Sequence, residues 1–201
     1  MIVLLDTSES LATCAAELGC DVGQLLTPLT RFRLQRTELP WAIDNGAYAG
    51  FDYKAFLSLL AREEHHRDES KFLTVPDVVG SATKTLAQFR LWAPRLQGWS
   101  LAFACQDGQE RVQIPWEVDA IFIGGSTKWK VSKHAVDIVK EAKDRGKWVH
   151  IGRVNNVCRY EGFAALGADS CDGTGLSRFT HMREGIGNRD NQEKLFESNP
   201  T

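Results

Sequence analysis

Carboxylates and glycines stand at the ends of several short apolar runs in this chain of 201 residues. The runs are "WAIDNGAY", "FLTVPDVVG", "IFIGGSTK" and "ADSCDGTGLSR", and each breaks abruptly into Asp, Gly or both. Carboxylates that are brought together raise each other's pKa, so a protonated member can act as an acid beside an ionised base or nucleophile. Asp44, Asp77 and Asp172 are therefore candidates for such chemistry.

Other groups at these ends are suited to recognising a flat ligand. Gln106 follows the run "LAFAC", and an amide there can meet the donor and acceptor edge of a heterocycle. Gly124 and Gly125 allow the backbone to approach a ligand closely and to expose its N–H groups. Three aromatic residues near run ends are candidates for stacking on a base, namely Tyr48, Phe51 and Trp129. Each feature, taken alone, is also compatible with a turn, a strand end or core packing.

The elements that must position these residues alternate along the chain. Apolar runs typical of strands cover 2–6, 23–29, 40–46, 71–77, 99–106, 119–125, 148–154 and 168–173. Amphipathic stretches typical of helices cover 8–19, 51–66, 81–96, 132–146 and 155–167. Such alternation predicts parallel strands joined by crossover helices.

Eight such units predict an α/β fold, a compact (β/α)8 TIM-like barrel formed by a single domain. We expect this catalytic domain to cover residues 1–180 and a polar tail to cover 181–201. A doubly wound open sheet is the alternative. Both architectures place ligands outside the carboxyl ends of the strands, which is where the unusual residues of this chain lie.

The composition narrows the class of protein. A net charge of −2 and an apolar content of 43% are ordinary for a globular protein, and no run is long enough to cross a membrane. The start "MIVLLDTSES" becomes acidic too soon for a signal peptide, so we expect a cytoplasmic location. Five scattered cysteines without a CxxC pair favour neither a disulfide framework nor structural zinc. We expect no cofactor and no metal, with magnesium beside a phosphate ligand as the alternative.

Two histidines need separate mention. His150, in "WVHIG", is predicted to be an interior histidine with its hydrogen bonds satisfied rather than a catalytic one. His181 follows "GLSRFT" and is within reach of the same strand ends, but no motif supports a role for it.

Six segments together resemble the tRNA-guanine transglycosylase superfamily, especially its small members that act on deazapurines or other modified bases in DNA. "DNGAY" (44–48) is similar to its Asp-Ser-Gly-Gly-Phe segment, "VPDVV" (75–79) to the strand whose acidic residue contacts the base, and "FACQDG" (103–108) to the segment whose Gln reads it. "IFIGG" (121–125) resembles the Gly-Gly segment, "HIGRVNN" (150–156) the Met-Gly-Val-Gly strand, and "GADSCDGTGLSR" (167–178) the Gly-x-Asp-x-x-Asp segment. The order is collinear over roughly residues 40–178.

The resemblance implies a TIM barrel and a role for each matching residue. Asp172 is implied to be the nucleophile that attacks the sugar C1′, with Asp169 as a residue that could exchange roles with it. Asp44 is implied to be the general acid/base or a positioning carboxylate, and Asp77 to bind the base edge. The implied substrate-binding residues, besides Asp77, are Gln106, Gly124, Gly125, Asn45, Tyr48, Arg153 and Asn155.

The expected activity is cleavage of the N-glycosidic bond of a modified base in DNA. Attack of water on the glycosyl-enzyme makes a DNA glycosylase, and attack of a free nucleobase makes a transglycosylase. The chain lacks the family's Cys/His zinc set and its RNA-binding additions, which favours DNA or a free nucleoside over tRNA. The same analogy places such an enzyme in phage–host conflict, where DNA carries unusual bases.

Two other functions remain open. A metabolic barrel enzyme acting on a phosphorylated small molecule would bind phosphate in the loops "GRVNN" and "DGTGLSR". A non-catalytic module would bind a modified nucleotide without turnover.

Overall fold

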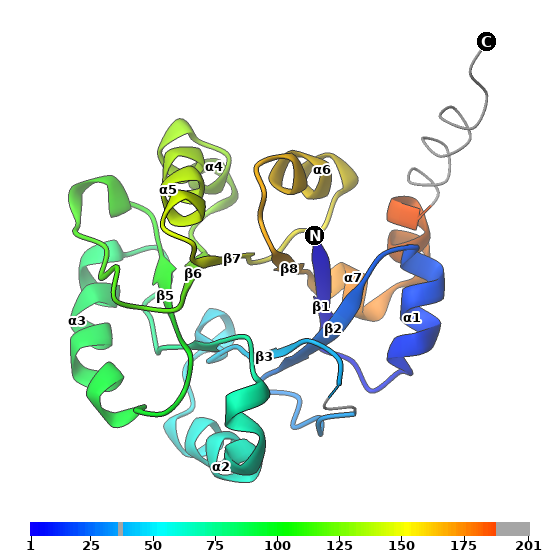
Figure 1. The fold of residues 1–201 in the computed structure, drawn as a ribbon, viewed down its shortest axis with the longest axis horizontal. Helices are drawn as coiled ribbons and strands as arrows, with labels where there is room; N and C mark the ends of the chain where they lie inside the picture. The colour runs from blue at the N-terminus through cyan, green and yellow to red at the C-terminus, as the bar shows by residue number, and fades with distance from the viewer. Residues whose placement is uncertain (36–37, 188–201) are drawn as a thin grey trace.

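Eight parallel strands close into a barrel in the computed structural model, which describes residues 1–35 and 38–187 (Figure 1). The strands are β1 (Ile2–Leu5), β2 (Val22–Leu26), β3 (Trp41–Ile43), β4 (Leu73–Thr74), β5 (Leu101–Cys105), β6 (Ala120–Ile123), β7 (Trp148–Ile151) and β8 (Ser170–Asp172). Each strand pairs with the next along the chain, and β8 pairs with β1, with Ile2 opposite Ser170. The predicted (β/α)8 barrel is thereby confirmed, and the open sheet is excluded because β1 and β8 are hydrogen-bonded neighbours.

Helices surround the barrel and cover its outer face. The five long ones lie in the five predicted stretches: α1 (Leu11–Leu18), α2 (Tyr53–Glu63), α3 (Ala82–Trp92), α5 (Lys133–Asp144) and α6 (Val157–Ala165). The shorter helices are η1 (Ala47–Ala49), η2 (Glu64–Glu69), η3 (Ala93–Arg95), η4 (Gln109–Arg111), α4 (Thr127–Lys130) and α7 (Thr174–Arg178). The sequence did not reveal α4 and α7, since four or five residues are too few to display a helical period.

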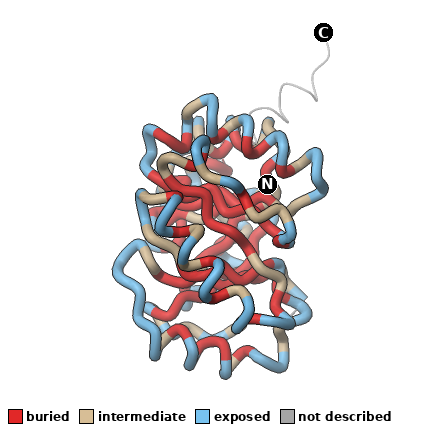
Figure 2. The backbone as a smooth tube through the Cα atoms, turned by 90° about the vertical axis from the view of Figure 1, so that its left-hand side faces the viewer, coloured by how far each residue is buried: buried red, intermediate tan, exposed pale blue. Residues whose placement is uncertain are grey.

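Local signals start and stop two of these helices. The Asp52 side chain accepts the Ala55 N–H at the start of α2, and Gly19 ends α1 in the left-handed conformation at φ 64°. The inner faces of the helices are buried against the strands, so the buried backbone forms a central layer within an exposed shell (Figure 2). No described helix combines the length and the apolar character that a membrane span requires.

Alternate residues of each strand point into the barrel and fill it. This interior cluster consists of Leu4, Leu25, Ala42, Phe72, Ala102, Ala104, Ala120 and Phe122. Four alanines leave space for three rings: Phe72 and Phe122 lie 5.0 and 4.8 Å, centroid to centroid, from the imidazole of His150. Because the interior is packed, a ligand can enter only at an end of the barrel.

The expected boundary at residue 180 does not match the structure. Residues 180–187 are helical, and within them Ile186 is 2% exposed. The buried Arg183 guanidinium binds the carboxylate of Glu9 at 2.8 Å and also that of Glu17. The barrel domain therefore extends at least to residue 187, and the rest of the expected tail, 188–201, lies outside the described residues. These ion pairs join segments that are far apart in the sequence, so no local pattern predicts them.

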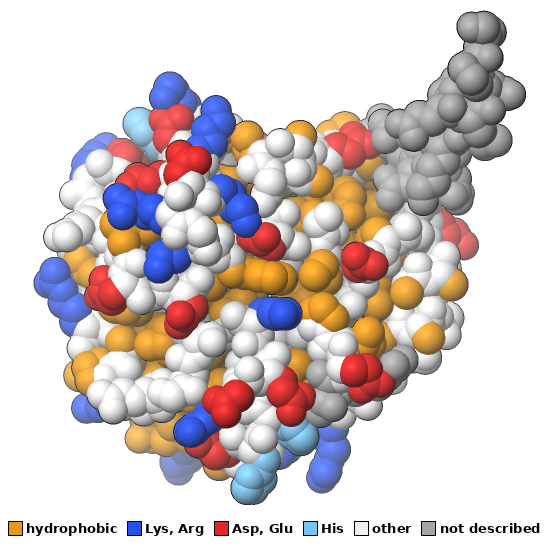
Figure 3. Space-filling model, in the orientation of Figure 1, with side chains coloured by type: hydrophobic (Ala, Val, Ile, Leu, Met, Phe, Trp, Pro, Cys, Tyr) orange, Lys and Arg blue, Asp and Glu red, His pale blue; other side chains and the backbone are white. Residues whose placement is uncertain are grey.

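Acidic and basic side chains are mixed on the face shown in Figure 3, around a hydrophobic centre. No large field of a single sign covers that face.

Candidate active site

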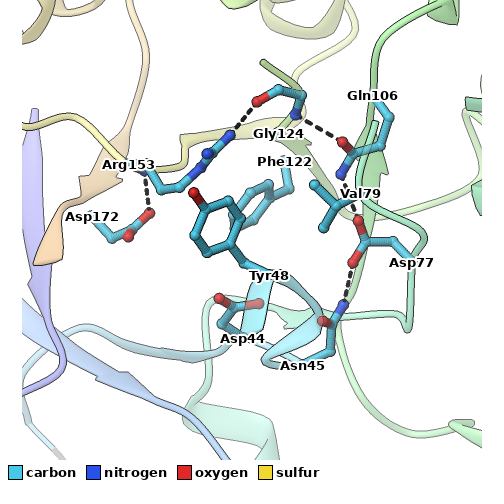
Figure 4. Close-up of a pocket in the computed structure, with 11 residues that line it drawn as sticks. Asp44, Asn45, Tyr48, Asp77, Val79, Gln106, Phe122, Gly124, Arg153 and Asp172 are labelled. Atoms are coloured by element: carbon cyan, nitrogen blue, oxygen red, sulfur yellow. Dashed lines mark hydrogen bonds between the residues drawn. The ribbon is translucent and has the colours of Figure 1, made fainter. Parts of the chain in front are cut away.

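The carboxyl-terminal ends of the strands form the mouth of the barrel, and a recess lies there (Figure 4). The first recess, as we call it, is lined by Asp44, Asn45, Tyr48, Asp77, Val79, Gln106, Phe122, Gly124, Gly125, Arg153 and Asp172. Every predicted site residue except Asn155 is in this set. The residues come from β3, β4, β5, β6, β7 and β8 or from the loops that follow them.

A second recess adjoins the first. It is lined by Asp6, Leu25, Thr27, Leu29, Thr30, Asp44, Gly46, Tyr48, Ala49, Arg153, Asp172, Gly173, Thr174, Ser177 and Arg178. The two recesses share Asp44, Tyr48, Arg153 and Asp172, and their volumes are about 50 and 220 Å³. The two central carboxylates therefore stand at the junction of a small recess and a larger one.

The two carboxylate oxygens of Asp172 have different surroundings. Oδ1 accepts the backbone N–H of Arg153 at 3.0 Å and lies 3.2 Å from Nε2 of His150. Oδ2 has no hydrogen-bond partner among the described residues, and the side chain is 16% exposed. One oxygen thus holds the carboxylate in place, and the other is available to a ligand at the junction of the two recesses.

A chain of hydrogen bonds inside the barrel fixes the tautomer of His150. The indole N–H of Trp148 donates to Oγ of Ser170 at 2.9 Å, and that hydroxyl lies 2.9 Å from Nδ1 of His150. Because Trp148 already occupies the hydroxyl as an acceptor, the hydroxyl proton is free to go to Nδ1. The imidazole then carries its own proton on Nε2 and donates it to Asp172.

The surroundings of His150 could be predicted from the sequence only in part. Its burial is confirmed, at 0% exposure, but its contact with Asp172 was missed. The contact depends on the register in which His150 lies opposite Ser170, and register is a tertiary property.

Asp44 is half-buried at the end of β3 and favours its protonated form. Burial, together with the negative charges of Asp172 and Asp77, raises the pKa of this carboxyl to about 7. The Gly46 N–H, which donates to Oδ1 at 3.3 Å, opposes it by stabilising the ionised form. Near neutral pH, Asp44 therefore holds a proton that it can give up.

Asp77 forms one polar wall of the first recess. Its Oδ1 accepts from the Asn45 amide at 2.9 Å, and its Oδ2 accepts from the Gln106 amide at 2.5 Å. Oε1 of Gln106 accepts the N–H groups of Gly80 and Gly125, both at 2.9 Å, which settles the orientation of that amide. Burial raises the pKa of Asp77, and the two amide hydrogen bonds lower it in part. The wall therefore presents a fixed arrangement of acceptors and donors.

Glycines and an aromatic pair shape the rest of this recess. A Cβ on Gly124 would lie 2.6 Å from Nε2 of Gln106, and one on Gly125 would lie 2.7 Å from the Trp129 ring. On the other side, the Arg153 guanidinium stacks 4.4 Å from the centroid of the exposed Tyr48 ring and donates to the Gly125 carbonyl. This pair connects the loops after β3, β6 and β7 across the mouth.

Asn155 does not line either recess. Its Oδ1 accepts the N–H of Gly175 at 3.0 Å and sits close to Gly173, so it joins the loop after β7 to α7. It faces a separate cavity that also contains His181, so neither side chain reaches the mouth. The prediction that Asn155 binds substrate is not supported by its position.

Asp169 cannot take the place of Asp172. It precedes β8 and therefore lies at the amino-terminal end of the barrel, a full strand away from the mouth. Its carboxylate binds the ammonium of Lys143 at 2.7 Å and accepts the N–H of Val149 at 2.7 Å. These contacts give Asp169 a structural role.

Of the three aromatic candidates, only Tyr48 lines the recesses. Phe51 packs edge-on against Phe56 and Trp92, with ring centroids 5.4 and 5.6 Å apart. Trp129 is buried, and its indole N–H donates to Glu110 at 3.2 Å. Both residues support the barrel rather than face a ligand.

Lys130 is a further residue near the site, and its burial was not expected from the sequence, where it belongs to a cluster of lysines typical of a solvated face. Its side chain is 1% exposed and its ammonium donates to the carbonyl of Gly152, directly before Arg153. Burial, together with the positive charge of Arg153, lowers the pKa of Lys130 to about 8. Lys130 thus anchors the loop that supplies an N–H to Asp172. Among the residues that the structure describes, no group of three or more His, Cys, Asp or Glu side chains is placed to hold a metal ion.

Fold and site together define a (β/α)8 barrel with carboxylates and amides gathered at the carboxyl ends of its strands. No family model matches the chain. No curated protein matches it either.

Solved structures do match, and one of them is a chain of the Amycolatopsis orientalis BexX/CysO complex. The alignment covers 100% of this chain and 91% of that chain, with a TM-score of 0.52 and 17% sequence identity. At this level of identity the likeness shows a shared barrel fold, and it carries no information on chemistry.

Proposed function

We propose that this protein cleaves the N-glycosidic bond of a modified base in DNA, with Asp172 as the nucleophile. The observation that carries the proposal is the pair of carboxyl groups at the junction of the two recesses. Asp172 offers an oxygen without a partner among the described residues, and Asp44 beside it has a pKa of about 7, so a large fraction of it holds a proton at neutral pH. A base in the first recess and its sugar in the second would present the glycosidic bond to both groups.

The proposed first step moves one electron pair and one proton. Oδ2 of Asp172 attacks C1′, the bond from C1′ to the base nitrogen breaks, and its electron pair leaves with the base. Asp44 transfers its proton to the departing base, while the N–H groups of His150 and Arg153 keep the carboxylate of Asp172 oriented. The products are a neutral base and a sugar esterified to Asp172.

The second step determines the reaction class. Asp44, now ionised, takes a proton from water as the water attacks C1′, which releases Asp172 and leaves an abasic site. Attack by a free nucleobase instead gives base exchange. Both outcomes share the first step and the same residues.

The polar wall fits recognition of a base edge. A base flipped out of the helix would lie over Phe122, with its edge toward Asp77 and Gln106, and Tyr48 would cover its outer side. The resemblance of the "DNGAY", "VPDVV" and "FACQDG" segments to the tRNA-guanine transglycosylase superfamily supports these roles. The setting that we propose is the cytoplasm during phage–host conflict, where DNA carries unusual bases.

The direct test incubates the protein with plain DNA and with phage DNAs that contain modified bases. Mass spectrometry of the released small molecules and alkali-labile strand breaks report cleavage, and a labelled deazapurine reports exchange. We expect release of a modified base by the wild type and none by Asp172→Asn with an unchanged unfolding temperature. Asp169→Asn is the matched control and should keep its activity, since Asp169 lies at the other end of the barrel. Retained turnover in Asp172→Asn would exclude this nucleophile.

A second candidate function rests on the far side of the second recess. Thr174, Ser177 and Arg178 follow β8 there, and Arg153 follows β7, which are the two places where barrels of this kind bind phosphate. A metabolic enzyme for a phosphorylated small molecule would use this corner. Thermal-shift screening with sugar phosphates and nucleotides separates the two candidates, because only the metabolic enzyme gains stability from a free sugar phosphate. Binding of a modified nucleotide without any turnover would indicate a binding module instead.

A further inference from the structure

The loop of residues 27–31, which we call the β2 loop, separates the second recess from a third cavity on the outer side. That cavity, the outer groove, has a volume of about 540 Å³ and is lined by Thr27, Pro28, Arg31, Asp52, Lys54, Ala55, Ser58, Leu59 and Arg62. Leu29 and Thr30 of the same loop face the second recess, and Thr27 belongs to both linings. The β2 loop thus forms a ridge, residues 27–31, between the candidate active site and the outer groove.

This ridge is held in one shape by contacts at its base. Thr30 Oγ1 donates to the Asp6 carboxylate at 2.6 Å and lies 3.2 Å from Oγ1 of Thr27. Behind the loop, the Arg62 guanidinium donates to the carbonyl of Phe32 at 2.7 Å. A loop that is anchored on both sides presents its tip without a large loss of conformational entropy on binding.

The tip of the ridge exposes an apolar side chain. Leu29 is 52% exposed and borders the second recess. Its Cγ lies 3.5 Å from the position that a Cβ on Gly46 would occupy, and Gly46 is two residues from Asp44. A large aliphatic group is therefore displayed to solvent beside the candidate catalytic carboxyl.

The outer groove carries cations without local partners. Arg31 and Lys54 are exposed, and their side chains have no hydrogen-bond or ion-pair partner among the described residues. Arg62 is neutralised by Glu63, and Asp52 is engaged in capping α2. Arg31 also has a left-handed backbone at φ 57°, a conformation that among the described non-glycine residues it shares only with Arg153. Strain of this kind tends to mark residues placed for contact with a ligand.

We propose that the β2 loop grips duplex DNA beside the flipped nucleotide, an inference that rests on the proposed function. Leu29 enters the base stack where the target base has left, and Arg31 and Lys54 bind phosphates of the flanking strand in the outer groove. Flipping a base opens a gap whose apolar faces are exposed to water, and an inserted aliphatic side chain covers them. Phosphates then meet two cations that the protein itself leaves uncompensated.

Binding of the full chain to fluorescently labelled oligonucleotides tests the role of Leu29 without depending on catalysis. The probes are a duplex with one central mismatch, which lowers the energy of flipping, and the single strand of the same sequence. Leu29→Ala should weaken duplex binding about tenfold, since the loss of a buried aliphatic group in a ligand interface amounts to roughly that factor. Its single-strand affinity should stay within about twofold, because no stack has to be filled. Leu91→Ala is the matched control, a leucine 50% exposed on α3.

Salt dependence tests the two cations. Arg31→Gln and Lys54→Gln should each reduce the slope of log K against log salt by about 0.9, the value for one phosphate contact. Arg90→Gln and Lys140→Gln, exposed positions on α3 and α5, are the controls and should leave the slope unchanged.

Each result decides a separate question. Equal duplex affinities of Leu29→Ala and Leu91→Ala would overturn the role of Leu29, and slopes equal to those of the controls would overturn the role of the groove. If base release from DNA persists in either case, the proposed function stands without this loop. If the wild type binds neither oligonucleotide at low salt, the loop proposal and the DNA substrate are both overturned.

Discussion

Asp172 is held by two N–H groups of very different origin. The Arg153 N–H belongs to a strained loop, whereas the imidazole N–H of His150 belongs to the sealed interior of the barrel. Both donate to Oδ1, so they orient the carboxylate and leave Oδ2 to a ligand. At the scale of single residues, the candidate nucleophile is thus positioned by one N–H from the barrel interior and one from a loop at the mouth.

This arrangement predicts a selective loss of turnover in His150→Phe. Phenylalanine keeps a ring between Phe72 and Phe122 but has no N–H for Asp172. We expect kcat to fall about 10- to 100-fold, in the range for loss of one oriented hydrogen bond, with KM changed less than about threefold. Steady-state kinetics of base release provides the measurement. An unchanged kcat would mean that Arg153 alone orients the carboxylate.

The raised pKa of Asp44 leads us to expect a pH dependence of activity. With a pKa of about 7, Asp44 loses, as the pH rises through 7, the proton that the proposed mechanism gives to the departing base. We therefore expect kcat to decline above about pH 7, and Asp44→Asn to remove this decline together with most of the activity. A pH–rate profile of wild type and variant checks the expectation, and a wild-type profile that stays flat to pH 9 would assign the proton to another group.

The raised pKa of this carboxyl also leads us to expect that the stability of the protein depends on pH. Its pKa in the folded state is about 7, raised from 3.8, so the folded protein binds a proton that the unfolded chain releases between these values. The free energy of unfolding therefore decreases as the pH rises from about 4 to 7. Asp44→Asn lacks this proton and should gain stability over the wild type at pH 8, but not at pH 4. Thermal unfolding at the two pH values measures the difference, and an equal gain at both would contradict it.

At the scale of elements, the end of β7 contacts two parts of the site. One is Phe122, which lines the first recess, and the other is Lys130, which anchors the loop that holds Asp172. A Cβ on Gly152 would lie 2.6 Å from the Phe122 ring, and the Gly152 carbonyl receives the buried ammonium of Lys130. The Phe122 ring can lie over residue 152 only because that residue has no side chain. The position of the Phe122 ring in the first recess is therefore set by the glycine at the end of β7.

Gly152→Ala should displace Phe122 and weaken both folding and activity. We expect a loss of about 1–3 kcal/mol in the free energy of unfolding, as for other overpacked sites. Gly162→Ala in α6 is the control. An added Cβ there meets no atom within 4 Å, and alanine in a helix should raise stability by about 0.5–1 kcal/mol. Urea unfolding of both variants tests the pair. Equal stabilities would show that β6 and β7 adjust without cost.

At the scale of the whole molecule, the barrel is completed by chain that follows its last strand. Residues 180–187 pack on α1, where Arg183 binds Glu9 and Glu17 and Ile186 is buried. The first helix and the end of the described chain therefore stabilise each other across the β1–β8 closure.

A chain truncated after residue 180 should be less stable than one truncated after residue 187. It would leave the carboxylates of Glu9 and Glu17 without the Arg183 guanidinium and expose the apolar site of Ile186. We expect an unfolding temperature lower by at least about 5 °C, since 2–4 °C corresponds to each kcal/mol in a protein of this size. Calorimetry of the two truncated chains gives the answer. Equal unfolding temperatures would mean that the domain ends at residue 180, as expected from the sequence.

The sequence by itself determined the alternation of strands and helices and the polar residues at each strand end. These are local properties, because a period of two or of 3.6 residues and a glycine or proline break are written in consecutive residues. Parallel strands have their carboxyl ends on one side, so Asp44, Asp77, Gln106 and Asp172 could be placed at one mouth before any coordinates were known. Closure of the barrel then brought them around the same opening.

Only the tertiary structure decided which neighbours each of these residues has. The contact of His150 with Asp172, the separation of Asp169 from the mouth, the structural role of Asn155 and the burial of Arg183 all follow from strand register and from packing between distant segments. Such contacts join residues that are far apart in sequence, or they depend on the register between two strands, which a shift of one residue would change. A local sequence pattern specifies neither.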